Sequence, residues 1–157
     1  MARKLPDAIV TPDDVLLLAL EIGQVADLQR EAAMRKSSKT PDLEISPQLL
    51  EWLDIKPGGA LPSATELDKS KLEAETIRQS APTATITLAA LPAHKFKSEL
   101  VSWFRSEIHP ETLVVFVLNR EIAGGLAIRF GSQIFDWSFR KLLLTNQQAM
   151  SKVLKDV

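Results

Sequence analysis

The two histidines are the first side chains to consider for metal binding or acid–base chemistry, because the chain has no cysteine. His94 and His109 fall at the two ends of an expected helix, and neither has a second ligand at the spacing of a metal site. We therefore expect both imidazoles to be surface groups, and we expect no bound metal. The absence of cysteine also removes disulfides and thiolate nucleophiles, and it fits a reducing compartment.

Glycine, aspartate and serine residues can form phosphate-binding loops, acid–base pairs and nucleophiles, but their positions in this sequence do not match those sites. The segment GGLAIRFG, from Gly124, has its glycines ahead of an expected strand, whereas a phosphate-binding loop or dinucleotide fingerprint leads into a helix. Adjacent Asp13 and Asp14 complement the positive end of an expected helix and are not an acid–base pair. No serine stands in a nucleophile elbow. The sequence thus predicts no catalytic residue, no cofactor and no enzymatic activity.

Charge and hydropathy limit the partners. The 157 residues carry a net charge of −1, with an acidic first half and a basic second half, so a nucleic-acid or lipid partner is not expected. The aromatic residues follow the periodicity of a core and do not alternate with lysine or arginine. The apolar run VLLLALEIG is too short to span a bilayer, and no leader opens the chain. We expect a cytoplasmic protein without direct membrane insertion.

Residues 1–80 have the pattern of a helical region. Thr11 is a good N-cap, Pro12 suits the first helical position, and apolar residues then recur at helical spacing. Ser63 and Glu66 form the signature of a capping box before a charged helix with few apolar residues. The expected helices lie near residues 12–36, 47–54 and 64–79.

Residues 81–157 change to a mixed pattern, which predicts a small α/β domain of order β-α-β-β-β-α. A run such as TLVVFVLN is typical of a buried strand, and PAHKFKSELVSWFRSEI is typical of an amphipathic helix. Expected strands lie near residues 84–90, 112–118, 125–130 and 133–137, and expected helices near 92–108 and 138–154. The predicted fold class is therefore α+β, with a short N-terminal helical region followed by this domain.

The register of the last two strands follows from the loop between them. Gly131 and Ser132 fit a two-residue type II′ turn, which places residue 130 opposite 133, 128 opposite 135 and 126 opposite 137. One face of this hairpin then carries only apolar residues and is predicted to be buried core: Leu126, Ile128, Phe130, Phe135 and Trp137. Arg129 and Asp136 share the other face, where we expect a surface ion pair.

A motif of spaced residues runs through this hairpin and just beyond it: Gly124, Gly125, Arg129, Gly131, Asp136, Ser138 and Arg140. With this motif, matched without gaps, residues 84–145 resemble the C-terminal half of the delta subunit of rotary ATP synthases, the family that includes the oligomycin-sensitivity-conferring protein. The chain departs from the family at Asn119 and Arg120, where the family has Asp-Pro, and at Trp137, where it has glycine. Residues 1–80 are divergent from the family's N-terminal half or shortened relative to it.

The resemblance implies a non-catalytic stator subunit that links the catalytic head of a proton-translocating ATP synthase to its peripheral stalk. The motif residues would then belong to a partner interface, with peripheral-stalk helices as partners and head subunits as further candidates. Such a protein would lie in the cytoplasm at the periphery of the inner membrane. The alternatives are a protein-interaction adaptor on a similar domain, unrelated to ATP synthesis, and a nucleic-acid-binding module.

Overall fold

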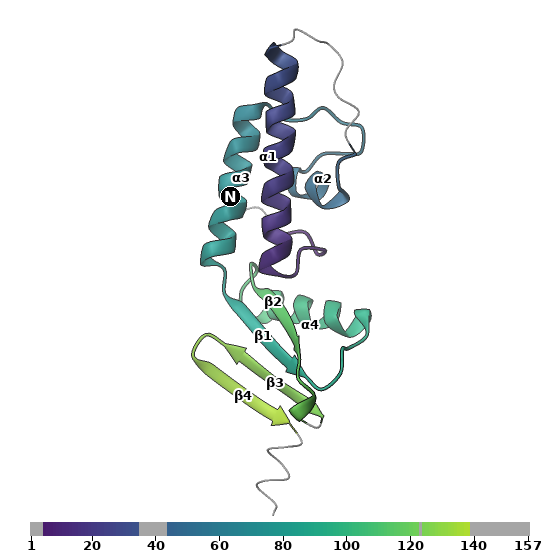
Figure 1. Ribbon diagram of the computed structural model, residues 1–157, viewed down its shortest axis with the longest axis vertical. Helices are drawn as coiled ribbons and strands as arrows, with labels where there is room; N and C mark the ends of the chain where they lie inside the picture. Colours follow the sequence, from purple (N-terminus) through teal and green to yellow (C-terminus); the bar gives the residue numbers. More distant parts are fainter. Residues whose placement is uncertain (1–4, 35–43, 123, 139–157) are drawn as a thin grey trace, which may run out of the picture.

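The computed structural model describes residues 5–34, 44–122 and 124–138, in which a helical hairpin stands at one end of a four-stranded sheet (Figure 1). The helices α1 (Pro12–Met34), α2 (Pro47–Leu53) and α3 (Ala64–Ser80) precede the sheet. The mixed helix and sheet content confirms the predicted α+β class. The helix predicted over 138–154 lies outside the described residues, apart from Ser138, which ends a strand.

Each of the three helices begins at a capping residue, whose side chain accepts a hydrogen bond from a backbone N–H of the first helical turn. The Thr11 hydroxyl accepts a hydrogen bond from the Asp14 N–H, while the Asp14 carboxylate accepts one from the Thr11 N–H. Ser46 caps α2, and Ser63 and Glu66 form the predicted capping box of α3. Each cap stabilises its helix by about 1 kcal/mol, so local sequence determines where each helix begins.

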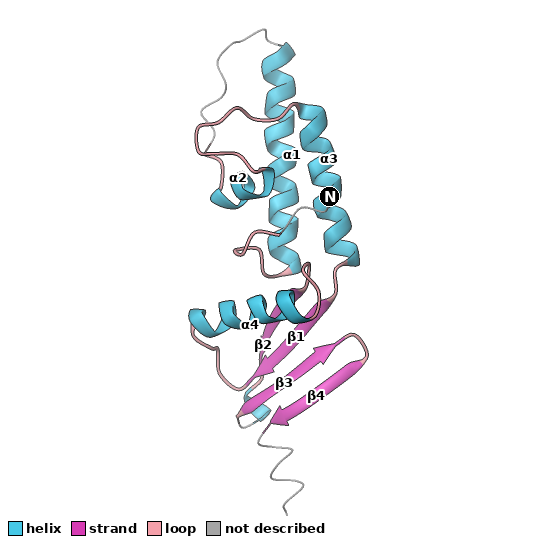
Figure 2. Cartoon of the chain, turned by 180° about the vertical axis from the view of Figure 1, so that it is seen from behind, coloured by secondary structure: helices cyan, strands magenta, loops and turns pink. Residues whose placement is uncertain are grey.

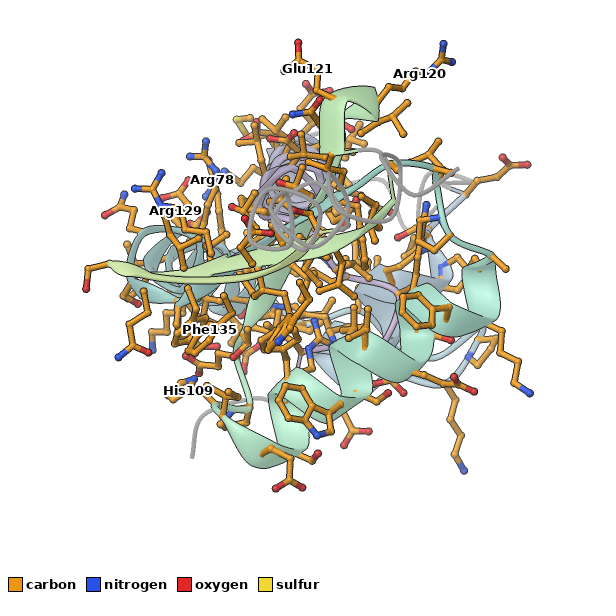
Figure 3. All side chains as sticks on the ribbon, turned by 90° about the horizontal axis from the view of Figure 1, so that it is seen from below. Arg78, His109, Arg120, Glu121, Arg129 and Phe135 are labelled. Carbon is orange, nitrogen blue, oxygen red and sulfur yellow. The ribbon has the colours of Figure 1, made fainter. Side chains whose placement is uncertain are left out.

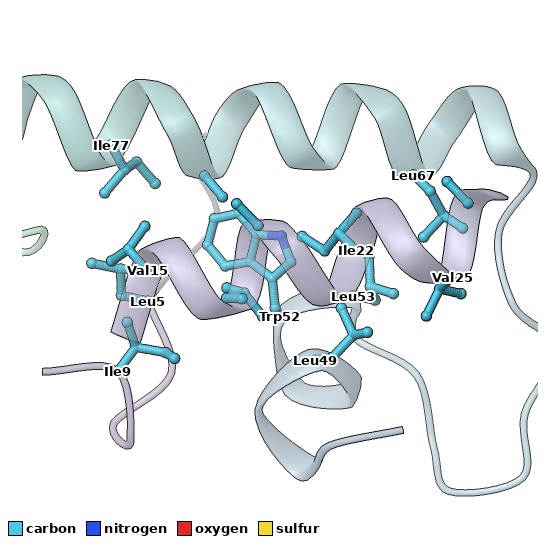
Figure 4. Close-up of a cluster of buried hydrophobic side chains, with 14 of the residues drawn as sticks. Leu5, Ile9, Val15, Ile22, Val25, Leu49, Trp52, Leu53, Leu67 and Ile77 are labelled. Carbon is cyan, nitrogen blue, oxygen red and sulfur yellow. The ribbon is translucent and has the colours of Figure 1, made fainter. Parts of the chain in front are cut away.

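The helical region has its own buried cluster, which contains side chains from all three helices (Figure 4). Trp52 of α2 is 2% exposed and belongs to this cluster together with Ile22 of α1 and Leu67 of α3. Arg30 of α1 bridges to Asp27 and to Asp68 of α3 at the surface of this hairpin. The short helix α2 thus packs beside α1 and adds its apolar side chains to the cluster of the α1–α3 pair.

The sheet has the strand order β2-β1-β3-β4. Strand β1 (Thr83–Leu88) runs parallel to β2 (Leu113–Leu118), and α4 (His94–Glu107) connects them across one face (Figure 2). Strands β3 (Gly125–Phe130) and β4 (Gln133–Ser138) continue the sheet antiparallel, after a short 3-10 helix at Arg120–Ile122. In this order, β2 and β4 are the two edge strands of the sheet that the structure describes.

A short segment before α1 joins the helical region to the sheet. The Val114 N–H donates to the Val10 carbonyl at 2.8 Å, and the Arg105 guanidinium of α4 donates to the carbonyls of Pro6, Ile9 and Thr112. The Arg105 side chain is 9% exposed, and burial lowers the pKa of its guanidinium, while nearby Asp7 acts in the opposite direction. This buried cation therefore ties three separate chain segments together.

The hairpin register is as predicted, but the prediction that its apolar face is buried core was wrong for β4. Phe130 pairs with Gln133, Ile128 with Phe135 and Leu126 with Trp137. Gly131 has a φ of 58°, as the predicted turn requires. However, Phe135 is 45% and Trp137 is 60% exposed. The physical reason is that α4 packs on β1 and β2, so its cover does not reach the edge strand.

Candidate functional site

An apolar groove of about 310 Å³ lies between α4 and the β3–β4 hairpin. On the helix side, Phe104 forms the floor at 2% exposure, while Trp103 and Ile108 rise from it and are 51% and 46% exposed. The Trp103 and Phe104 rings meet edge to face, with centroids 5.1 Å apart. This geometry stabilises aromatic pairs beyond simple burial and holds the exposed indole in place.

The hairpin forms the second wall of the groove. Phe135 and Trp137 stack on each other with ring centroids 5.8 Å apart, and Phe130 stacks on the Phe104 ring of the floor at 6.4 Å. Figure 3 places Arg129 and Phe135 on opposite sides of the sheet, so the charged side chain does not enter the groove. The wall is therefore a rigid aromatic surface that water still reaches.

The chemistry available in the groove is apolar contact. Gln133, at one end, is the single polar side chain among its lining residues, and no ionisable group lines it. Across the described ranges, no three His, Cys, Asp or Glu side chains gather as they would around a metal ion. A groove with exposed tryptophan and phenylalanine walls fits the buried centre of a protein–protein interface, where aromatic anchors dominate the binding energy.

A larger hollow of about 550 Å³ lies between the segment before α1 and the start of α4. Its wall includes Asp7, His94 and Lys97, and the Lys97 ammonium lies 5.6 Å from the centre of the Phe116 ring. The exposed His94 is the first residue of α4, and His109, also exposed, accepts a hydrogen bond at Nδ1 from the Glu111 N–H. The two histidines thus lie at opposite ends of α4 and are both surface residues, as the sequence predicts.

The motif glycines shape the backbone of the hairpin. Gly124 and Gly125 have φ values of 130° and 79°, a region that L side chains rarely adopt. A Cβ atom at Gly125 would lie 2.3 Å from the Trp137 carbonyl oxygen, whereas one at Gly131 would meet, among the described residues other than its chain neighbours, no atom within 4 Å. Gly125 is therefore required for the close approach of β3 and β4, and Gly131 for the turn alone.

The polar motif residues lie on the face of the hairpin away from the groove. Arg129 pairs across the strands with Ile134, and Asp136 with Ala127. Among the residues that the structure describes, Arg129 makes no ion pair, so the expected bridge to Asp136 was wrong, while the Asp136 carboxylate accepts a hydrogen bond from the Ser138 N–H at 2.8 Å. Arg140 lies outside the described residues. The motif glycines thus determine the backbone conformation, whereas Arg129 and Asp136 lie on the face of the sheet away from the groove.

Sequence reasoning missed that Trp103 and Ile108 form a wall of an open groove, because it interpreted the spacing of the aromatic residues as the periodicity of a core. The signal was the adjacent pair Trp103 and Phe104, whose side chains point about 100° apart on a helix. When Phe104 faces the sheet, Trp103 must lie at the margin of the buried stripe, and its 51% exposure follows from this position.

Comparison with known proteins adds no family to this description. No protein-family model matches the chain, and no curated protein matches its sequence. Within the described residues, none of the helices combines the length and the apolar character needed to cross a membrane.

Proposed function

We propose that this chain is a non-catalytic, delta-like stator subunit that links the catalytic head of a proton-translocating ATP synthase to its peripheral stalk. The observation that carries the proposal is the open aromatic groove, lined by α4 on one side and by the β3–β4 hairpin on the other. Its occupant in the complex is the apolar face of an amphipathic stalk helix, a mode of recognition in which a few large side chains enter a groove.

The sequence motif supports the same assignment. The hairpin with the delta-like residues is the element that supplies Phe135 and Trp137 to the groove. Gly125 allows the two strands to approach closely, so the motif maintains the backbone beneath the aromatic wall. A substitution of this glycine is expected to disturb the wall without removing any group that touches the partner.

A stator must also transmit force between its two attachment points. The buried Arg105 joins α4 to the segment before α1, and the Val114–Val10 hydrogen bond joins that segment to the sheet. These contacts couple the helical region to the groove-bearing sheet. The helical region is then available for the head while the groove holds the stalk helix.

The test measures retention of the stalk and head subunits of the ATP synthase from the same organism on the purified, immobilised chain. We expect both to be retained, and we expect Phe135→Ser and Trp137→Ser to weaken stalk binding at least about tenfold, as for aromatic hot spots. Ile134→Ser is the matched control, because Ile134 is 68% exposed on the opposite face of the same strand.

Two results would contradict the proposal. If neither stalk nor head subunits are retained, the chain acts outside ATP synthase, and the adaptor interpretation replaces the stator. If the stalk is retained equally by the groove variants and by Ile134→Ser, docking occurs elsewhere on the domain. Circular dichroism of each variant verifies that the fold is intact.

A further inference from the structure

We propose that the groove has a second occupant from the same chain: residues 139–157 bind there in the free protein and compete with the stalk helix. The identity of the competitor rests on the proposed function above, whereas the intramolecular contact stands on the observations below.

The first observation is that one half of the apolar sheet face has no cover among the described residues. Helix α4 buries the β1–β2 half, in which Ala84, Ile86 and Val114 are fully buried. On the β4 side, Phe135 and Trp137 of the same face remain 45% and 60% exposed. A sheet buries its apolar face against another layer, and a second segment beside α4 would complete that layer.

The second observation is where the chain leaves the sheet. Strand β4 ends at Ser138, directly after Trp137 of the groove wall, so residues 139–157 start at that end of the groove. The six residues of β4 span about 20 Å. A helix over residues 139–154, as the sequence predicts, would be about 24 Å long. The segment can therefore return along the whole groove towards Gln133 without a long linker.

The third observation is the residue pattern of the segment. Phe139, Leu143, Met150 and Leu154 recur at helical spacing and would form one apolar stripe. Four basic residues and one acidic residue stand among its 19 positions, with Lys152 and Lys155 near the end. Just beyond the far end of the groove, the exposed Glu107 is the last residue of α4 and directly precedes the lining residue Ile108. A returning segment brings its lysines towards this carboxylate.

The test uses the exposure of the groove tryptophans in the full chain. Trp52 is 2% exposed, so acrylamide quenching of fluorescence reports mainly on Trp103 and Trp137. We expect Leu143→Asp to raise the quenching constant about twofold by uncovering both indoles. Gln148→Asp adds the same charge on the opposite side of the predicted stripe and should leave quenching unchanged. Equal quenching of the wild type and Leu143→Asp would overturn the proposal.

A second measurement covers the case in which Leu143→Asp perturbs folding. Because the chain has no cysteine, the pair Gln133→Cys and Lys152→Cys can be joined selectively by a short bismaleimide. We expect an intramolecular cross-link with this pair, and none with Ile134→Cys and Lys152→Cys, since Ile134 lies on the other face. A cross-link that forms only between two molecules would mean that a second copy covers the groove, and would overturn the proposal.

The two proposals fail separately. Leu143→Asp should strengthen the binding of the stalk helix, because it removes the competitor. If the cross-link forms and no stalk subunit binds any variant, the stator function fails while the intramolecular contact stands. If stalk subunits bind and the cross-link does not form, the intramolecular contact fails alone.

Discussion

Replacing the buried Arg105 with alanine should destabilise the protein by about 3 kcal/mol, because the change leaves buried backbone carbonyls without a donor. The guanidinium donates to the carbonyls of Pro6, Ile9 and Thr112. Pro6 keeps the N–H of Ile9 as a second donor, at 3.0 Å, so the loss falls mainly on Ile9 and Thr112. Each unsatisfied buried carbonyl costs about 1–3 kcal/mol, so the two together cost about 2–6 kcal/mol, and the expected loss of about 3 kcal/mol lies in the lower half of that range.

The assay is urea denaturation followed by far-UV circular dichroism, with the free energy of unfolding obtained by linear extrapolation. For a chain of this size the expected loss corresponds to a decrease in Tm of roughly 6–12 °C. Arg30→Ala is the matched control, because Arg30 is 43% exposed and makes surface ion pairs, so its removal should shift the midpoint far less. A loss below about 1 kcal/mol for Arg105→Ala would refute the argument that this cation secures the junction.

Gly125→Ala should lower the free energy of unfolding by at least about 2 kcal/mol, because a Cβ there collides with the neighbouring strand. Gly131→Ala should lower it by about 1 kcal/mol, for its positive φ alone. Equal losses of thermal stability in the two variants would contradict the close approach of β3 and β4 at Gly125. Phe135→Ala should lower the free energy of unfolding by about 1–1.5 kcal/mol, since Phe135 is 45% exposed, whereas Phe104→Ala should lower it by about 3–5 kcal/mol, since Phe104 is buried. If a denaturant titration finds the larger loss for Phe135→Ala, the assignment of Phe135 to the wall and Phe104 to the floor of the groove is wrong. The backbone and side-chain hydrogen bonds from the serine that caps α3 lower the pKa of Glu66, so its stabilising contribution is present above the ordinary glutamate pKa and is lost as pH falls through the lowered value. The difference in melting temperature between wild type and Glu66→Gln should accordingly vanish in acid, and a constant difference from pH 7 to pH 2 would contradict this cause.

Local features of this fold could be predicted from the sequence because their physical causes are local. The capping box at Ser63 and Glu66 determines where α3 begins, and the two-residue loop at Gly131 determines which residues of β3 and β4 face each other. Both depend on groups a few residues apart. The amphipathic stripe of α4 likewise predicted a buried Phe104.

The candidate site could not be predicted, because it depends on the order of the strands in the sheet and on which of these strands α4 covers. Nothing in the hairpin sequence indicates that β4 is an edge strand, and without that fact Trp137 reads as a core residue. Arg105 was missed for a related reason. Its acceptors are backbone carbonyls of residues 6 and 9, which have no signature in the sequence.

The segment before α1 has a consequence for how the chain folds during synthesis. Its hydrogen bonds join residues as far as 99 positions apart, so Pro6, Ile9 and Val10 lack these partners until α4 and β2 have left the ribosome. Such distant contacts slow folding, since the loop between them must close before the contact gains any stability. Leu113 of β2 belongs to the buried cluster of the helical region, so helices α1 to α3 emerge before that cluster is complete. During that interval the nascent helical hairpin exposes apolar surface that the finished protein buries, and such surface is prone to aggregation.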